Sequence, residues 1–171
     1  LLAAHYYLGA AYAGLGDDAK AQTAYTAAAA LGEADGAEPS VYLAYTYEQL
    51  GRIDEAIALY VRLLAERESA DLHAYLGALY AQKGADALAR QEYAAALRLD
   101  GGQTLALLML GNSAFAQGDW AAAVEAYEDY LAQEESAAVH GYAAQAAQQL
   151  GDLDAAQRHL QEAVRLYPGS G

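Results

Sequence analysis

Four histidines are the side chains of this chain best suited to metal binding or proton transfer, because imidazole ligates transition metals and titrates near neutral pH. Three of them, His5, His73 and His140, stand at one position of a repeat of about 34 residues, in copies two apart. Such copies are separated by two layers of helix pairs, roughly 20 Å at about 10 Å per helix. These three histidines therefore cannot share one metal ion. We interpret them as half-buried ring residues of a helical array, and we assign no role to His159.

Paired carboxylates are the second group that could do chemistry, as the general acid and base of a hydrolase. Such pairs occur at Asp17-Asp18, Asp54-Glu55, Glu128-Asp129 and Glu134-Glu135. All fall at expected helix starts or on expected outward-facing helices, where a solvated acidic surface explains them. The chain has no cysteine, and it contains no nucleophile motif, phosphate-binding loop or dinucleotide fingerprint. We therefore predict a protein that is not an enzyme and that uses no cofactor and no metal ion.

A regular succession of glycines defines the elements that must position these side chains. The spacings are 35, 33, 34 and 33 residues, between Gly16, Gly51, Gly84, Gly118 and Gly151. Each glycine closes the same local pattern, for example TYEQLGRIDEAIALY around Gly51. Strand signals are almost absent, and a period of about 34 residues is typical of an array of helix-turn-helix units. We expect an all-α protein with ten main helices and no sheet.

The residues at fixed positions of the repeat fit two antiparallel helices joined by a tight turn. With the glycine counted as position 15, position 20 is always alanine and position 8 is always glycine or alanine. These small residues are expected to face each other, with larger residues at positions 7, 11 and 24 filling the space around them. Glycine at position 15 lets the chain leave the first helix in a left-handed conformation. Asp17, Asp119 and Asp152, just after it, are expected to cap the second helix.

This pattern resembles the tetratricopeptide repeat, whose hallmark is W-x2-L-G-x2-Y, then A-x3-F, then P. The resemblance covers nearly the whole chain, from Leu2 to Pro168, as five tandem copies in one domain of residues 1–171. The approximate repeats are 2–35, 37–70, 70–103, 104–137 and 137–170. The tryptophan position departs from the hallmark, since it holds histidine, serine or leucine. The resemblance implies a right-handed α-solenoid of antiparallel helix pairs, whose first helices line a concave groove for a segment of another protein.

Charge is unevenly distributed along the repeat. The chain carries 9 Lys+Arg against 23 Asp+Glu, a formal net charge of -14, which repels nucleic acid and membrane phosphates and attracts basic partners at low salt. Every lysine and arginine falls at position 14 or later, so the first helices carry only Glu38, Glu48 and Asp71. By the resemblance, domains that hold acidic chaperone C-termini need Lys, Arg and Asn at five groove positions. Those positions here are Tyr6, Ala10, Tyr42, Asp71 and Tyr75. We therefore predict a groove for a neutral or basic segment, with no nucleic acid bound and no membrane insertion.

Position 6 of the repeat, which in this fold points into the groove, holds a large side chain in all five copies. These residues are Tyr7, Tyr42, Tyr75, Met109 and Tyr142. Tyrosine offers broad contact area with few rotatable bonds and keeps a hydrogen-bonding tip, which suits a recognition surface. We assign the five residues, together with Tyr45, to the candidate partner-binding site. The alternative is that these rings pack between neighbouring first helices and never meet a ligand.

The first helix of repeat four, TLALLMLGNSAFAQ, is apolar nearly all round. Such a helix is either buried on every side or presents an apolar face to a partner. On the groove side we expect Leu105, Leu108, Met109, Asn112 and Phe115, which would form an adaptable apolar patch of the kind that marks interaction sites. The alternative is that Met109 and Phe115 plug space left by alanines at the junction with repeat five.

The chain as a whole is expected to be a non-enzymatic scaffold that binds an apolar or aromatic, neutral-to-basic peptide or protein segment. The alternative, from a different class, is a structural module that associates with copies of itself through its apolar solenoid ends, Leu1-Leu2 and Tyr167. A third interpretation is the repeat region of a larger multidomain protein, since the chain begins with Leu1 inside a periodic segment. Its composition fits cytoplasm and periplasm equally well.

Overall fold

The computed structural model describes residues 1–34 and 39–167, and within these ranges it contains ten α-helices and no strand. The all-α prediction is therefore confirmed for the described chain. Contacts divide it into two compact units, Leu1–Leu79 and Tyr80–Gly171, each of which is treated by itself. Glu38 and Pro168, two residues of the sequence-based predictions, lie outside the described residues.

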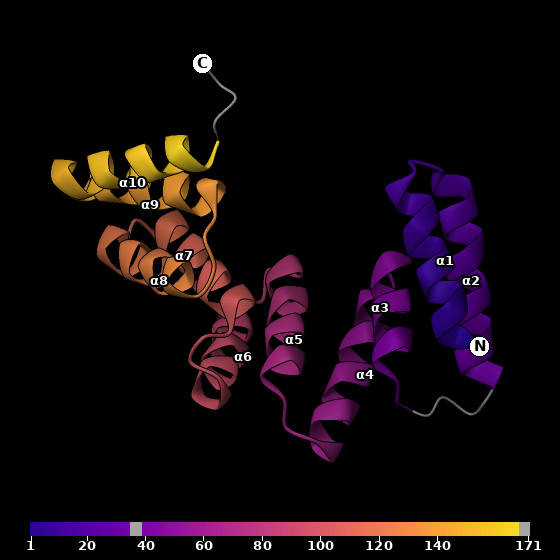
Figure 1. Ribbon diagram of the computed structural model, residues 1–171. Helices are drawn as coiled ribbons and strands as arrows, with labels where there is room; N and C mark the ends of the chain where they lie inside the picture. Colours follow the sequence, from indigo (N-terminus) through magenta and orange to yellow (C-terminus); the bar gives the residue numbers. More distant parts are fainter. Residues whose placement is uncertain (35–38, 168–171) are drawn as a thin grey trace. The chain divides into compact units, whose positions relative to one another are not determined.

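Within each unit the helices follow one another in antiparallel pairs (Figure 1). The N-terminal unit contains α1 (Leu2–Gly14), α2 (Asp18–Ala34), α3 (Val41–Gln49) and α4 (Ile53–Glu66). Helix α5 (Ala70–Gln82) begins in this unit and ends in the next. The C-terminal unit continues with α6 (Asp86–Leu99), α7 (Thr104–Gln117), α8 (Trp120–Gln133), α9 (Ala137–Leu150) and α10 (Leu153–Leu166). Helices α1 to α4 pack in sequence order, and so do α6 to α10.

The turns between paired helices have the geometry that the sequence predicts. All five glycines at position 15 have positive φ, between +70° and +87°, a conformation that only glycine adopts without strain. The three aspartates that follow them accept a backbone hydrogen bond from the second helix: Ala122 N donates to Asp119 Oδ1 at 3.2 Å, and Ala155 N to Asp152 Oδ1 at 2.9 Å. Lys20 N donates to Asp17 Oδ1 at 3.2 Å. The predicted caps are confirmed.

Small residues at position 8 make room for the tyrosine ring at position 24. A Cβ atom added to Gly9 would come within 2.6 Å of the Tyr25 ring, and one added to Gly111 within 2.5 Å of the Tyr127 ring. The alanines at position 20 are also buried, and the atoms nearest to position 8 belong to the ring at position 24. These tyrosines are almost fully buried: Tyr25, Tyr60, Tyr93 and Tyr127.

The burial of position 7 differs between repeats. Leu43 and Leu76 are buried, whereas Leu8 is 44% exposed. The prediction that position 7 fills the core is therefore wrong for Leu8.

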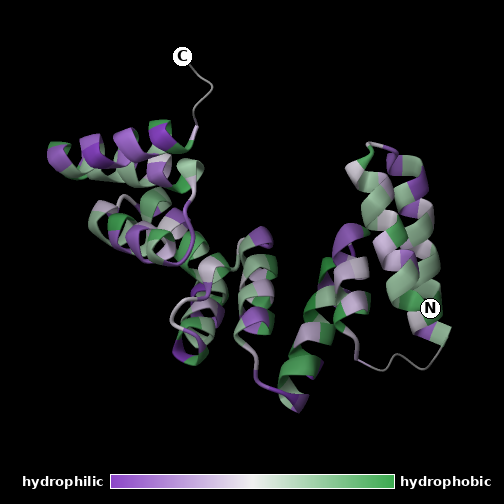
Figure 2. Ribbon diagram, viewed as in Figure 1, coloured by the Kyte–Doolittle hydropathy of each residue, from purple (hydrophilic) through white to green (hydrophobic). Residues whose placement is uncertain are grey.

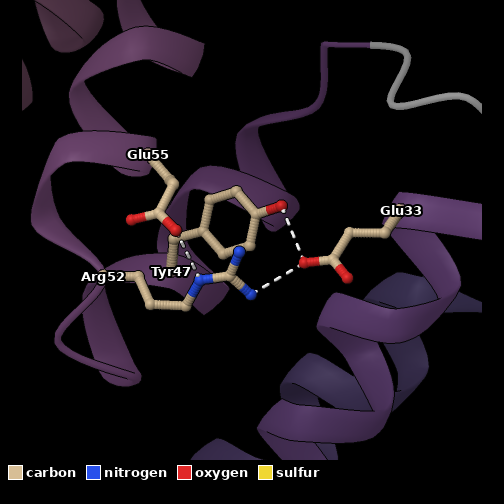
Figure 3. A network of polar contacts seen from close by, with 4 residues as sticks. All are labelled: Glu33, Tyr47, Arg52 and Glu55. Atoms are coloured by element: carbon tan, nitrogen blue, oxygen red, sulfur yellow. Dashed lines mark hydrogen bonds and ion pairs between the residues drawn. The ribbon is translucent and has the colours of Figure 1, made fainter.

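A polar network joins α2 to the α3–α4 pair (Figure 3). Arg52 Nη1 lies 2.7 Å from Glu33 Oε1, and Arg52 Nε lies 3.0 Å from Glu55 Oε1. The Tyr47 hydroxyl donates to the same Glu33 oxygen at 3.2 Å, while the guanidinium stacks over the Tyr47 ring. Hydrogen bonding to Arg52 holds the pKa of Glu33 below its usual range. The network links repeats one and two, although its exposure limits each ion pair to a modest contribution.

Candidate functional site

At the junctions between repeats, the same set of positions surrounds the tyrosine at position 24, and we call this surrounding the junction niche. It is bordered by the tyrosine at position 24 of a second helix and by positions 9 and 12 of the first helix before it. Positions 6 and 9 of the next first helix complete the border. The niches of Tyr60, Tyr93 and Tyr127 follow the same register along the sequence. Their contents differ, and this difference decides where a partner segment has room to bind.

In the N-terminal unit, tyrosine rings interlock across the first helices. Tyr45 is central, with its ring centroid 5.4 Å from that of Tyr75 and 5.7 Å from that of Tyr6. Tyr42 lies 6.0 Å from Tyr6, and its hydroxyl is 3.2 Å from the Tyr7 hydroxyl. Tilted and edge-to-face contacts at these distances stabilise aromatic pairs. The predicted residues therefore form two contacting pairs, Tyr7–Tyr42 and Tyr45–Tyr75, which Tyr6 joins.

The Tyr60 niche is occupied by side chains of the chain itself. The Tyr60 hydroxyl donates to Glu48 Oε1, and the Tyr60 ring lies 6.1 Å from Tyr75 and 6.4 Å from Tyr45. Burial raises the pKa of the Glu48 carboxyl and, with its hydrogen bond to Glu48, that of Tyr60. The contacts support the alternative stated for the tyrosine ladder, that these rings pack between first helices, for Tyr45 and Tyr75. Tyr7 and Tyr42 remain partly exposed.

In the C-terminal unit, the Tyr127 niche is open. A cavity of about 300 Å³ is lined by Asn112 and Phe115 of α7, Tyr127 of α8, and Tyr142 and Gln145 of α9. The Tyr127 hydroxyl donates to Asn112 Oδ1 at 2.8 Å, and burial raises the pKa of Tyr127 to about 12. Tyr142 is 43% exposed. This cavity brings together three residues that the sequence singles out, from two repeats.

The Tyr93 niche is a second open cavity, of about 390 Å³, in the same unit. Among its lining residues are Ala81, Tyr93, Met109 and Asn112. Asn112 borders both cavities, so the two lie next to each other along α7. The rim carries Asp86 and Arg90, and Arg90 Nη1 donates to Gln117 Oε1 at 2.9 Å.

The apolar patch predicted on α7 is divided between cavity and core. Phe115 and Leu108 pack against a buried cluster that includes Ala123, Tyr127 and Val139, and the Phe115 ring lies 5.0 Å from Trp120. Met109 and Asn112 line the open cavities. Leu105 is half-buried. Phe115 thus both contacts the core and borders a cavity, so the two interpretations given for it are not exclusive.

Sequence patterns did not assign Tyr6, Tyr93 or Gln145 to the site, nor did they pair His140 with His159. The imidazole Nδ1 atoms of the two histidines lie 3.0 Å apart, and His159 is buried. The assignment of no role to His159 is therefore corrected. Burial, and next the proximity of His159, lower the pKa of His140. In the described part of the chain, no group of three His, Cys, Asp or Glu side chains could hold a metal ion.

Taken together, the paired helices, the positive-φ glycines and the open niches define a class, the helical repeat proteins that present binding surfaces. The chain belongs to the tetratricopeptide repeat family, since the family model described as Tetratricopeptide repeat matches residues 41–104 and 108–171. The resemblance drawn from the sequence is confirmed. Repeats of this family typically form non-enzymatic scaffolds for protein interactions. None of the described helices has the length and apolar character needed to cross a membrane.

Solved structures share the fold at low sequence identity. PilW, described as a widely conserved type IV pilus biogenesis factor, aligns with a TM-score of 0.77 at 18% identity, over 99% of this chain and 79% of that one. A thermophilic repeat protein of the same family from Thermus thermophilus has a TM-score of 0.70 at 22% identity, over 99% and 93%. A MamA structure has a TM-score of 0.72 at 21% identity, over 94% and 95%. A comparison with curated protein sequences found no match.

Proposed function

We propose that this protein is a non-enzymatic scaffold that binds an apolar or aromatic, neutral-to-basic segment of another protein through the first helices of its C-terminal unit. The observation that carries the proposal is the open Tyr127 niche, where Asn112, Phe115 and Tyr142 border one cavity of about 300 Å³. In the N-terminal unit, by contrast, the Tyr60 niche is occupied by Tyr75 and Glu48. The binding surface therefore centres on repeats four and five.

The chemistry of the cavity suits an apolar anchor with a hydrogen-bonded backbone. Phe115 and Tyr142 offer ring surface, and aromatic anchors in pockets are typical hot spots. The Asn112 oxygen accepts from Tyr127, which leaves its amide N–H groups as donors for a partner. Gln145 adds a second side-chain amide. These groups recognise a neutral segment without requiring a charge on it.

The charge of the first helices and of the whole chain determines the second part of the ligand preference, for a neutral or basic segment. Helices α1, α3, α5, α7 and α9 contain no lysine or arginine, whereas Glu48 and Asp71 lie on α3 and α5. Basic segments are attracted to a chain of net charge -14, and this attraction weakens as the Debye length falls from about 10 Å at 0.1 M salt to about 3 Å at 1 M. Acidic segments and nucleic acid gain no counter-charge on these helices.

Calorimetric titration with three synthetic 12-residue peptides tests the proposal. The peptides share a central Leu-x-x-Phe pair and differ only in flanking residues: neutral, lysine or glutamate. We expect the lysine-flanked peptide to bind most tightly at low salt and to approach the neutral one at 1 M salt. Tyr142→Ala should weaken the binding of both peptides. Tyr7→Ala, which removes an exposed tyrosine of the other unit, should leave their binding unchanged. Tight, salt-sensitive binding of the glutamate-flanked peptide or of DNA would contradict the proposal.

Self-association is a second candidate function, favoured by apolar side chains on the two terminal helices. Figure 2 shows α10 as alternating hydrophilic and apolar bands, and its Leu153, Leu160 and Val164 are exposed. Leu1 and Leu8 are exposed at the start of the chain. Exposed apolar patches of this kind mark interaction sites in soluble proteins. Light scattering across a hundredfold concentration range tests this: a constant mass of one chain excludes it, and Leu160→Lys should abolish any concentration-dependent rise.

A further inference from the structure

The buried hydroxyl of Tyr93 has no hydrogen-bond partner, although the Tyr93 side chain is only 2% exposed. A buried donor without an acceptor is rare in folded proteins and destabilises them. The hydroxyls at the same position of repeats two and four are both satisfied, by Glu48 for Tyr60 and by Asn112 for Tyr127. Among these three repeats, the missing partner is thus specific to repeat three.

The register explains why Tyr93 lacks an acceptor. Glu48 stands at position 12 of its repeat, and the residue at position 12 of repeat three is Ala81. Ala81 and Tyr93 both line the cavity of about 390 Å³. Because alanine is shorter than glutamate, repeat three has an open space at this position and an unpaired hydroxyl donor beside it.

The cavity wall indicates which acceptor fits. Met109 and Ala116 supply an apolar lining, and the charged lining residues are one of each sign, Asp86 and Arg90, so together they select neither an anion nor a cation. In the other two repeats, the acceptor of the tyrosine hydroxyl is a carboxylate, Glu48, or an amide, Asn112. Burial raises the pKa of the Glu48 carboxyl, because the charged form is disfavoured in such a niche. A neutral amide avoids that desolvation. Burial raises the pKa of Tyr93 to about 12, so its hydroxyl remains a donor at neutral pH.

We propose that the Tyr93 niche binds an amide-ended side chain, glutamine or asparagine, of the partner segment, with the amide oxygen accepting a hydrogen bond from the Tyr93 hydroxyl. This inference deepens the proposed function and rests on it. The niche lies beside the Phe115–Tyr142 cavity, because Asn112 borders both. A segment with an apolar anchor in one cavity and a glutamine in the other would contact both.

The state of the hydroxyl is tested first, without any ligand. Chemical denaturation compares Tyr93→Phe with Tyr60→Phe and Tyr127→Phe, which differ only in whether a hydrogen bond is lost. We expect Tyr93→Phe to leave the midpoint unchanged or raise it, and the two control variants to lower it. If Tyr93→Phe lowers the midpoint as much as Tyr127→Phe does, the hydroxyl has a partner in the free protein and the proposal is overturned.

The ligand preference is tested by NMR titration of the full chain with N-acetyl-glutamine N-methylamide and its glutamate and leucine counterparts. Shifts at Ala81 and Met109 should saturate at about two- to tenfold lower concentration for the glutamine probe, the range of one net hydrogen bond. Tyr93→Phe should remove this preference. Ala81→Gln, which supplies the amide internally, should block the probe and raise stability, whereas Ala81→Leu should block it without that gain. Equal binding of the leucine probe, or an unchanged preference in Tyr93→Phe, overturns the proposal.

The outcomes separate this inference from the proposed function. Peptides that bind through Tyr142 with no preference for glutamine at the Tyr93 niche overturn this inference alone. A glutamine probe that binds at Tyr93 while none of the three 12-residue peptides binds overturns the proposed scaffold function alone.

Discussion

Nδ1 of His140 lies 3.0 Å from Nδ1 of His159, across the α9–α10 pair. Such a contact needs one ring to donate and the other to accept, so both rings cannot be protonated while it persists. Glu128 Oε1 lies 3.4 Å from the other nitrogen, Nε2, of His159. Glu135 and Glu162 raise the pKa of His140, but burial and then the proximity of His159 outweigh them and lower it below the usual 6.5.

This pair predicts that the last helix pair loses stability in mild acid. A histidine whose folded pKa is lowered binds more protons when unfolded, so its contribution to stability is present above pH 6.5 and is lost as pH falls below that value. We expect the unfolding free energy to decrease between pH 7.5 and 5.5 by well under the limit of about 1.4 kcal/mol per pH unit for one proton, because His140 is partly exposed. Denaturation of His140→Asn over this range should show a flatter dependence. An equal slope in the variant would assign the pH dependence to other groups.

Two helix-interior glycines of the C-terminal unit should respond oppositely to alanine. A Cβ atom at Gly111 would meet the Tyr127 ring at 2.5 Å, whereas one at Gly141 meets nothing within 4 Å. Gly111→Ala should therefore lower the unfolding free energy by about 1–3 kcal/mol through overpacking. Gly141→Ala should raise it by about 0.5–1 kcal/mol through better helix propensity. Urea denaturation measures both, and a stabilising Gly111→Ala would contradict the close packing of position 8 against position 24.

The backbone of the fold could be predicted from the sequence because its determinants are local. The glycine at position 15 and the aspartate that follows it each act within one turn, so signals such as Gly118 and Asp119 identify helix boundaries directly. The packing of the Tyr127 ring against Gly111 was not predicted, since it depends on how closely α7 and α8 approach each other. The exposure of Leu8 depends on which helices cover it, which position in the repeat does not encode.

The site could be predicted only in part, for a related reason. The composition of α7 drew attention to Met109, Asn112 and Phe115, and these residues border the open cavities. The sequence did not separate open niches from filled ones, because that depends on side-chain length at position 12 and on the ring opposite it. The difference between Glu48 and Ala81 in the aligned repeats predicts which niche is open. It can be interpreted only when the structure shows that position 12 lies beside Tyr60 and Tyr93.

Glu48 is expected to destabilise the protein at neutral pH. Burial raises the pKa of its carboxyl above the usual 4.5, so its charged form is disfavoured, and stability present below pH 4.5 is lost as pH rises through the raised value. Glu48→Gln keeps an oxygen for the Tyr60 hydroxyl and removes the charge. We expect up to about 1 kcal/mol of stabilisation at pH 7, limited by partial exposure, and little at pH 4. Thermal melts at both pH values decide this, with Glu125→Gln on the exposed face of α8 as the control.

Tyr142 and Phe115 should separate binding from stability. Phe115 packs against the buried cluster around Val139 and against Trp120, so Phe115→Ala should lower the unfolding free energy by about 2 kcal/mol, less than the usual 3–5 kcal/mol for a fully buried ring. Tyr142 is 43% exposed, and Tyr142→Ala should change stability by less than about 1 kcal/mol.

Both variants should weaken the binding of the neutral 12-residue peptide. For Tyr142→Ala the loss of binding free energy should be about 2 kcal/mol or more, the range of a hot spot. The matched control is Tyr7→Ala, which removes an exposed tyrosine at the same repeat position in the other unit and should leave affinity unchanged. Calorimetry and denaturation on the same samples give both quantities. Unaltered affinity in Tyr142→Ala would remove this cavity from the binding surface, and a loss of about 3 kcal/mol or more of stability in Phe115→Ala would place that ring in the core alone.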